Sequence, residues 1–266
     1  MRFCRFSPLD PSFPKTLPEN SPSRWGLIQG DQIQEITAPP WSQWSRASRS
    51  RPLAKTRLLA PAEPSKIVCV GRNYAAHAAE LGNEVPKEPL IFLKPPSSII
   101  GPDDPIVLTP YSQRVEHEGE LALIVGRRCS QLTDSEDPLS YLLGYTCLND
   151  VTARDIQKNE VQFTRAKGFD TFCPVGPHIE TQLDPTNVLV ETRVNGARRQ
   201  SSSTSLMIYP VPFLVRFISR MMTLLPGELI ATGTPAGVGP LVPGDIAEVS
   251  VAGVGVLRNP VHAPHA

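Results

Sequence analysis

We predict a mostly β, α+β fold with a rolled or sandwiched sheet from three features of the sequence. The 266 residues are 40% hydrophobic, which is enough to build a core for one large domain with a small one beside it. The 29 prolines disfavour long helices. Candidate strands outnumber candidate helices, and the two do not alternate as they would in a doubly wound sheet or a (β/α)8 barrel.

The first part of the chain, residues 1–65, is predicted to be a small N-terminal β subdomain followed by a connector. It carries all three tryptophans and an excess of basic over acidic residues, unlike the rest of the chain. Gly30 and Asp31 form a two-residue hairpin turn between two strand candidates. The Ser- and Arg-rich stretch 42–57 has no acidic residue and is predicted to be a solvated connector. The strands are expected at residues 1–6, 25–29 and 32–37.

Residues 66–266 are predicted to form the larger domain. A helix is expected over residues 73–81, with Gly82 as its C-terminal stop, and two more over 152–159 and 210–222. Asn195–Gly196 is a strong two-residue hairpin signal. The strands are expected at residues 67–71, 90–93, 116–125, 143–149, 188–194, 228–232 and 246–251.

The composition excludes several classes of protein. The net charge is zero, whereas a nucleic-acid-binding protein normally has a basic excess. No apolar run approaches the roughly 18 residues that span a bilayer, and the first residues lack the apolar core of a secretory signal. The five cysteines are widely spaced and contain no CxxC, which argues against disulfides and a cysteine-ligated metal. We therefore expect a cytoplasmic enzyme that binds neither nucleic acid nor membranes.

The sharpest chemical signal is an acidic cluster in the segment VEHEGELALIVGR (115–127). In one strand, Glu116, Glu118 and Glu120 share a face, and the apolar residues that follow indicate burial. Adjacent buried carboxylates repel each other, and a divalent cation relieves that repulsion. Their spacing alone leaves a metal site and a solvated sheet face equally open.

A third carboxylate favours the metal site. The apolar segment LLGYTCLND (142–150) is a predicted strand that ends in Asp150, where it can complete the cluster. Asp155 competes for this role. However, Thr152 and Asp155 have the spacing of a capping box, which gives Asp155 a structural function at a helix start.

Seven segments of the chain together resemble the fumarylacetoacetate hydrolase family. The resemblance runs in order over residues 66–262, and the nearest family members in size are those that hydrolyse acylpyruvates, decarboxylate oxaloacetate or isomerise hydroxy-diene dioates. The segments include GRNYAAHAAELG (71–82), HEGELALIVGR (117–127), GYTCLNDVTARDIQ (144–157), KGFDTFCPVGP (167–177), VNGARRQ (194–200) and LPGELIATGTPAGVG (225–239).

The resemblance implies a mixed β-roll for the catalytic domain and a metal centre within it. Glu118, Glu120 and Asp150 would bind Mg²⁺ or Mn²⁺, with Ca²⁺ as a substitute, and leave positions for a small 2-oxo acid. It also implies a homodimer. The motif after GRNYA matches the family's His-x-x-Glu pair, so His77 and Glu80 would activate a water molecule on a helix that closes over the substrate.

Four further positions carry over from the family. Lys167 would stabilise the negative charge of the reacting substrate, and Gln157 would contact the substrate. Thr234 would hold the substrate carboxylate, and Arg72 would either bind substrate or anchor its loop. The segment SSSTSLMI (201–208) departs from the family's pattern, because Leu206 stands where an Asp is common. This departure leaves the substrate open.

The function that the sequence places first is metal-dependent cleavage of a C–C bond in an acylpyruvate or oxaloacetate, as a hydrolase or lyase, through an enolate of pyruvate. The alternative is an isomerase or tautomerase of 2-hydroxy-diene dioates or oxaloacetate. The carboxylates alone do not distinguish these reactions. The presence of His77 and Glu80 favours cleavage. A non-catalytic metal-binding protein of the same fold is a third hypothesis, which the complete set of matched residues disfavours.

Overall fold

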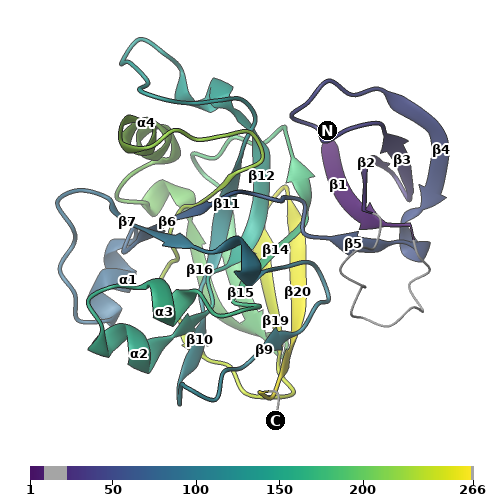
Figure 1. The fold of residues 1–266 in the computed structure, drawn as a ribbon. Coiled ribbons are helices and arrows are strands. Elements are labelled where there is room, and N and C mark those ends of the chain that lie inside the picture. The colour runs from purple at the N-terminus through teal and green to yellow at the C-terminus, as the bar shows by residue number, and fades with distance from the viewer. Residues whose placement is uncertain (9–22, 265–266) are drawn as a thin grey trace.

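The computed structural model describes residues 1–8 and 23–264 and confirms the mostly β fold (Figure 1). The helices are α1 (Ala75–Glu80), α2 (Arg154–Asn159), α3 (Thr164–Lys167) and α4 (Val211–Met221), with 3₁₀ turns at Leu53–Lys55, Pro96–Ser98, Pro138–Tyr141 and Thr204–Leu206. The strands are β1 (Arg2–Ser7), β2 (Arg24–Gln29), β3 (Gln32–Ile36), β4 (Arg46–Pro52), β5 (Arg57–Leu59), β6 (Ile67–Gly71), β7 (Leu90–Lys94), β8 (Ile99–Ile100), β9 (Ile106–Val107), β10 (Val115–His117), β11 (Gly119–Val125), β12 (Leu142–Asn149), β13 (Thr152–Ala153), β14 (Cys173–Glu180), β15 (Leu189–Val194), β16 (Ala197–Ser203), β17 (Leu229–Ala231), β18 (Gly239–Pro240), β19 (Ile246–Val251) and β20 (Gly255–His262).

A twelve-stranded sheet runs through most of the molecule. Its main path is β4-β3-β2-β1-β14-β12-β11-β17-β6-β7, with β5 paired to β1 and β8 paired to β14. The N-terminal strands join this sheet where β1 pairs with β14, and they form a separate group beside the rest of the molecule in Figure 1. A five-stranded sheet has the order β16-β15-β19-β20-β9, and a small sheet has the order β13-β10-β18.

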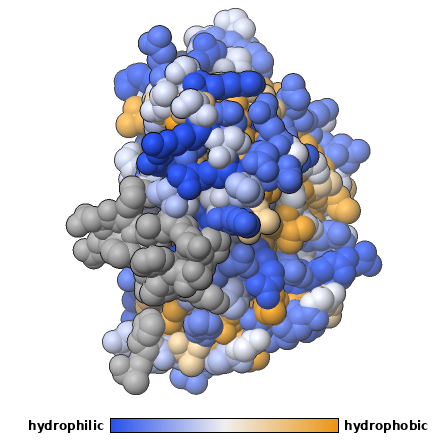
Figure 2. Space-filling view, turned by 90° about the vertical axis from the view of Figure 1, so that its right-hand side faces the viewer, coloured by the Kyte–Doolittle hydropathy of each residue, from blue (hydrophilic) through white to orange (hydrophobic). Residues whose placement is uncertain are grey.

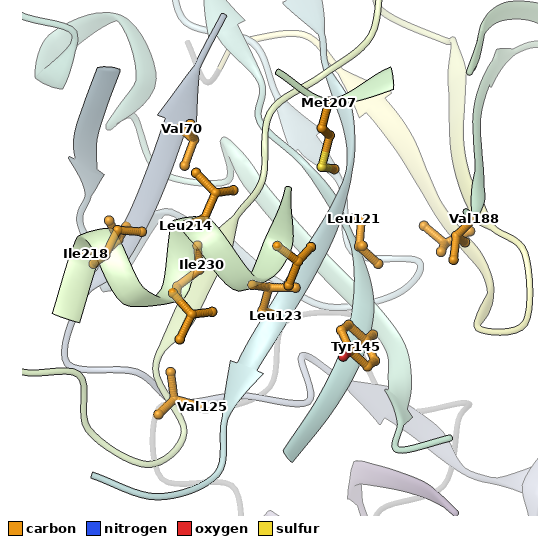
Figure 3. Close-up of a cluster of buried hydrophobic side chains, with 14 of the residues drawn as sticks. Val70, Leu121, Leu123, Val125, Tyr145, Val188, Met207, Leu214, Ile218 and Ile230 are labelled. Atoms are coloured by element: carbon orange, nitrogen blue, oxygen red, sulfur yellow. The ribbon is translucent and has the colours of Figure 1, made fainter. Parts of the chain in front are cut away.

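Strand β11 is buried on both faces and divides the core into two clusters. Leu121, Leu123 and Val125 point to one side, against α4 and the five-stranded sheet. Ala122 and Ile124 point to the other side, toward the N-terminal strands. Figure 3 shows α4 lying across the first cluster, with Leu214 and Ile218 directed at the sheet. Because side chains alternate along a strand, Glu120 near the start of β11 points to the same side as Ala122 and Ile124.

Two predicted elements differ from the structure. The stretch 42–57 is not a mere connector, because β4 within it pairs with β3 at the edge of the large sheet. Its sequence, RASRSRP, has no apolar alternation, so nothing in the pattern indicated a strand, and its basic side chains suit an exposed edge. The predicted strand 116–125 is also interrupted: β10 and β11 flank Glu118 and belong to different sheets.

The predicted turns are confirmed. Gly30 has a φ of 61° in the tight connection between β2 and β3. Asn195 and Gly196 both have positive φ and join β15 to β16, as the Asn-Gly signal predicts. Helix α1 ends before Gly82, whose φ is 70°. Helix α4 agrees with the predicted range to within a residue at each end, whereas α3 was not predicted.

Hydrophilic residues predominate on the face drawn in Figure 2, with hydrophobic residues in small scattered groups. Among the described residues, no helix is long and apolar enough to cross a membrane. All five cysteines are buried and unpaired in the structure. Burial raises the pKa of the Cys147 thiol to about 12, which fits a packing role for it.

We predict that Leu123→Ala lowers the free energy of unfolding by about 3 kcal/mol, because it leaves a cavity between β11 and α4. Leu206→Ala is the matched control, since Leu206 is 64% exposed; it should cost less than about 0.5 kcal/mol. Urea denaturation measures both. A loss below about 1 kcal/mol for Leu123→Ala would contradict the assignment of β11 to the centre of the core.

Candidate functional site

Three buried carboxylates meet where strands β11 and β12 approach each other at one end. Glu118 lies between β10 and β11, Glu120 lies near the start of β11, and Asp150 follows the last residue of β12. One oxygen from each carboxylate lies within 4.8 Å of the others. The register of the two strands explains this meeting, because Gly119 pairs with Asn149 and the Asp150 amide donates to the Glu118 carbonyl at 2.8 Å. The predicted acidic triad is therefore assembled by strand pairing.

Three basic side chains are buried against these carboxylates. Lys167 Nζ lies 2.8 Å from Glu118 Oε2 and 2.5 Å from Asp150 Oδ2. Lys94 Nζ donates to Asp150 Oδ1 at 2.7 Å. Arg154 binds Glu118 with one nitrogen and Glu116 with another, the latter at 2.6 Å. These contacts offset the cost of burying the charges.

Glu120 differs from its two neighbours, because no basic residue in the described ranges forms an ion pair with it. Its Oε2 accepts a hydrogen bond from the Gly233 amide at 2.8 Å. Burial and the neighbouring charges of Asp150 and Glu118 raise the pKa of Glu120. Burial also opposes ionisation of Glu118, yet the charges of Lys167 and Arg154 hold its pKa below the usual value. The cluster thus has one carboxylate that no basic side chain of the described residues pairs with.

These observations fit a hard divalent cation. All three donors are carboxylate oxygens, the set that Mg²⁺, Mn²⁺ and Ca²⁺ prefer over zinc. A cation beside Glu120 would supply the positive charge that the described residues do not provide there. Glu118, Glu120 and Asp150 are the residues that would hold it.

The carboxylates line a cavity of about 430 Å³, a size suited to a small organic acid. Its charged wall consists of the triad together with Arg154 and Lys167. The segments around α1, β7, α2 and α3 contribute an apolar rim to the cavity, beside polar side chains such as Asn83 and Gln157. This apolar rim consists of Leu81, Leu90, Phe92, Val161 and Phe163.

His77 lines the same cavity from α1, and Glu80 holds it from behind. The two lie one helical turn apart, which brings His77 Nδ1 within 3.3 Å of Glu80 Oε2. Both Glu80 oxygens also accept from the Gly237 amide, at 3.0 and 3.1 Å. Because a carboxylate only accepts, His77 carries its proton on Nδ1 and keeps Nε2 as a free base. Glu80 itself does not line the cavity.

The remaining predicted residues also line the cavity, with some of their polar groups already engaged. Gln157 Oε1 accepts a hydrogen bond from Arg154. The Thr234 hydroxyl donates to the Gly119 carbonyl at 2.9 Å and accepts from Gln200 at 2.7 Å, so its hydrogen is not directed into the cavity. Arg72 is half-buried and has a φ of 55° in the turn before α1. The structure thus brings eight of the nine predicted residues into one cavity and places Glu80 directly behind it.

Two residues of the site were not predicted from the sequence, and a third has a different structural role from the one predicted. Lys94 and Arg154 were not predicted, although a lysine at the end of an apolar strand and an arginine in the motif NDVTARD were visible signals. The predicted capping box is wrong, because α2 begins at Arg154 and has no side-chain cap. Asp155 instead accepts hydrogen bonds from Ser112 and the Gln113 amide, which fixes the loop before β10.

Comparison with known proteins identifies two family matches in this chain. Residues 66–262 match the family described as "Fumarylacetoacetate (FAA) hydrolase C-terminal". Residues 1–61 match the family described as "Rv2993c-like, N-terminal".

Three individual proteins illustrate the similarity. Protein Rv2993c of Mycobacterium tuberculosis is 51% identical over 86% of this chain and 87% of its own length. A mitochondrial oxaloacetate tautomerase of Xenopus laevis is 42% identical over 77% of this chain and 68% of its own. The crystal structure of a 2-hydroxyhepta-2,4-diene-1,7-dioate isomerase from Mycobacterium marinum is 43% identical, covers both chains completely and has a TM-score of 0.87.

We predict that Glu120→Gln weakens Mn²⁺ binding by at least about tenfold, because it removes the carboxylate that lacks a basic partner in this cluster. The electron paramagnetic resonance signal of free Mn²⁺ measures the affinity. Glu116→Gln is the control, since Glu116 is equally buried and paired with Arg114 and Arg154 but does not line the cavity; it should keep the affinity. Equal Mn²⁺ affinity in the Glu120 variant and the unaltered chain would contradict the assigned ligand set.

Proposed function

Because this chain belongs to the fumarylacetoacetate hydrolase family, we propose that it is an enzyme that uses a divalent cation to move a proton on a small 2-oxo acid. The reaction is keto–enol tautomerisation or the shift of a double bond in a 2-hydroxy-diene dioate. The substrate is a dicarboxylate of the oxaloacetate or heptadienedioate type.

The names of two relatives support proton transfer over C–C cleavage, which the sequence alone placed first. One relative is named an oxaloacetate tautomerase and another a hydroxyheptadienedioate isomerase. Each of these reactions removes a proton from one atom of a 2-oxo or 2-hydroxy acid and adds a proton to another. Proton transfer is therefore the first proposal, and C–C cleavage is the second.

The observation that carries the proposal is the oriented imidazole of His77 beside the charged wall. Its Nδ1 is held by Glu80, so Nε2 is the basic atom, and His77 is a lining residue of the cavity. Histidine is suited to this task, because its ordinary pKa lies close to neutral pH. Glu80 fixes the tautomer and stabilises the ring when it becomes positively charged.

The charged wall binds and polarises the substrate. A bound Mg²⁺ or Mn²⁺ would act as a Lewis acid on the 2-oxo group and the adjacent carboxylate. Lys167 and Arg154 add buried positive charge beside the same region, where negative charge develops on the 2-oxygen. Arg72 and Lys158 also line the cavity and are available to the distal carboxylate of a dicarboxylate substrate.

The proton balance of the reaction needs no further reactant. His77 Nε2 removes the proton from C3, and the electron pair of that C–H bond forms the C2–C3 double bond. The charge moves to the 2-oxygen. Return of the proton to that oxygen gives the enol. From a 2-hydroxy-2,4-diene the same base removes the proton of the 2-hydroxyl instead, and its return to C5 of the dienolate gives the 2-oxo-3-ene, in which the double bond has shifted. The sum is an isomerisation in which His77 is regenerated.

A second candidate function is hydrolytic C–C cleavage of an acylpyruvate. It is favoured by the contact of His77 with Glu80, since such a pair can also activate a water molecule. The two functions differ in their products, because only cleavage releases pyruvate.

We predict that the purified chain with Mn²⁺ converts enol-oxaloacetate to its keto form without producing pyruvate, because its site supplies a base and charge stabilisation. Loss of the enol absorbance in the ultraviolet follows the first process, and lactate dehydrogenase with NADH detects pyruvate. EDTA should abolish the enzymatic rate. Release of pyruvate from an acylpyruvate, in step with its consumption, would instead support the hydrolase.

We predict that His77→Ala lowers kcat by about 10²- to 10⁴-fold, since it removes the base. Its Mn²⁺ affinity should be unchanged, because His77 is not a ligand in the proposed site. His262→Ala is the matched control: it removes an exposed imidazole from β20, far from the lining of the cavity, and should keep full activity. Undiminished turnover in the His77→Ala variant would exclude His77 as the base.

A further inference from the structure

A second cavity, of about 420 Å³, lies outside the candidate active site. It is lined by His117, Arg198, Arg199 and residues 237–240, and it shares no lining residue with the catalytic cavity. Apart from Gly237, whose amide binds Glu80, these residues have no role in the proposed reaction. Two arginines and a buried histidine in one cavity are a chemically distinctive set.

His117 contributes a buried ring nitrogen without a partner. The side chain is fully buried, and its Nε2 has no hydrogen bond within the described residues. Its Nδ1 lies 3.1 Å from Gln200 Oε1. That oxygen also accepts from the Gly119 amide, while Gln200 Nε2 donates to the Pro235 carbonyl at 2.7 Å. The amide is therefore oriented, so Nδ1 is the donor and Nε2 of the neutral ring is an acceptor that lacks a donor.

A β-bulge explains why two consecutive arginines line the same cavity. In a regular strand Arg198 and Arg199 would point to opposite faces. However, the β15–β16 register shifts here: Thr192 pairs with Gln200 and Arg193 pairs with Arg198, which leaves Arg199 as the extra residue. A bulge re-aims side chains in this way and is commonly found beside functional sites. Arg198 has one long contact, with Glu191 at 3.5 Å.

Two glycines leave this cavity open. A Cβ on Gly239 would lie 3.6 Å from His117 Nε2, so a larger residue there would cover the ring nitrogen. Gly237 has a φ of 102°, and a Cβ on it would lie 2.1 Å from the Arg199 carbonyl oxygen. The loop can therefore approach β16 this closely only with glycine at position 237.

We propose that His117, Arg198 and Arg199 form a second binding site, for a phosphate-like oxyanion that retains one O–H group. The two guanidinium groups bind the ionised oxygens. The O–H group donates to His117 Nε2 and satisfies the orphaned nitrogen. Monohydrogen phosphate has this combination at neutral pH, whereas sulfate has no hydrogen to donate. The site is therefore selective for phosphate over sulfate.

This site is connected to the active site through its own residues. The amide of Gly237 holds Glu80, which orients His77. Gln200 joins the ring of His117 to the hydroxyl of Thr234, which lines the catalytic cavity. An anion that fixes Arg199 against the 237–240 loop therefore also restrains Glu80.

The test is calorimetric titration of the full chain, with Mg²⁺ present, by inorganic phosphate at pH 7.5 and constant ionic strength. We expect one phosphate per chain, with an affinity at least about tenfold lower in Arg198→Ala and in Arg199→Ala. Arg193→Ala is the matched control, because it removes the same charge from the same hairpin at an exposed position outside the cavity. It should bind phosphate as the unaltered chain does.

Several outcomes would overturn the proposal. Absence of phosphate binding by the unaltered chain would do so, as would equal weakening in all three arginine variants, which would indicate a general charge effect. Unchanged binding in the Arg198 and Arg199 variants would place phosphate elsewhere, such as in the catalytic cavity. Sulfate should bind at least about tenfold more weakly than phosphate; equal affinities would exclude the hydrogen bond to His117.

Hydrogen–deuterium exchange tests the connection without relying on activity. Phosphate should slow exchange in peptides covering residues 75–82 and 233–240 of the unaltered chain, and it should have no such effect in Arg199→Ala. Identical exchange with and without phosphate would show that the anion does not restrain Glu80.

Discussion

The balance of buried charge at the end of β11 and β12 is the constraint on which the rest of the structure depends. Four carboxylates, of Glu116, Glu118, Glu120 and Asp150, are buried together. Arg114 and the buried Lys94, Arg154 and Lys167 pair with three of them, whereas Glu120 has no basic partner among the described residues. Buried ions of one sign are tolerated only when their partners are fixed in place. The short segments that carry these partners, β7, α2 and α3, are placed so as to bring each one to the cluster. A bound divalent cation would supply the positive charge that Glu120 lacks and would leave positive charge for an anionic substrate.

The loop at residues 233–239 unites the functional parts of the molecule. The Gly233 amide binds Glu120, Thr234 lines the cavity, and the Gly237 amide binds Glu80. A single segment therefore contacts the acidic triad, the support of the histidine and the proposed anion site. Most of these contacts are made by its backbone amides. Glycine permits the positive φ of 100° at Gly233 and the close approach of Gly237 to the Arg199 backbone.

Much of the fold could be predicted from the sequence, because apolar alternation and turn signals are local. The candidate site beyond the acidic triad was predicted only from the resemblance to a known family. Hairpins such as the one at Asn195–Gly196 depend on two residues, and the triad follows from motifs at strand ends. The missing parts depend on tertiary structure. The strand β4 has no apolar pattern, because its stability comes from pairing with β3. Lys94 and Arg154 were missed because their burial is evident only once the carboxylates meet, and the break at Glu118 becomes visible only in the pairing of the strands.

The division of the catalytic cavity into two kinds of wall bears on how such proteins diversify. The carboxylates of the charged wall lie on or beside strands whose other side chains form the core, so a change there disturbs folding and chemistry together. The apolar rim comes from short segments outside the main core; Val161, for example, is 94% exposed although it lines the cavity. Evolution can therefore alter the rim, and with it the shape of the accepted substrate, at little cost in stability. One fold can in this way acquire relatives that share a first chemical step but differ in the molecule on which they perform it.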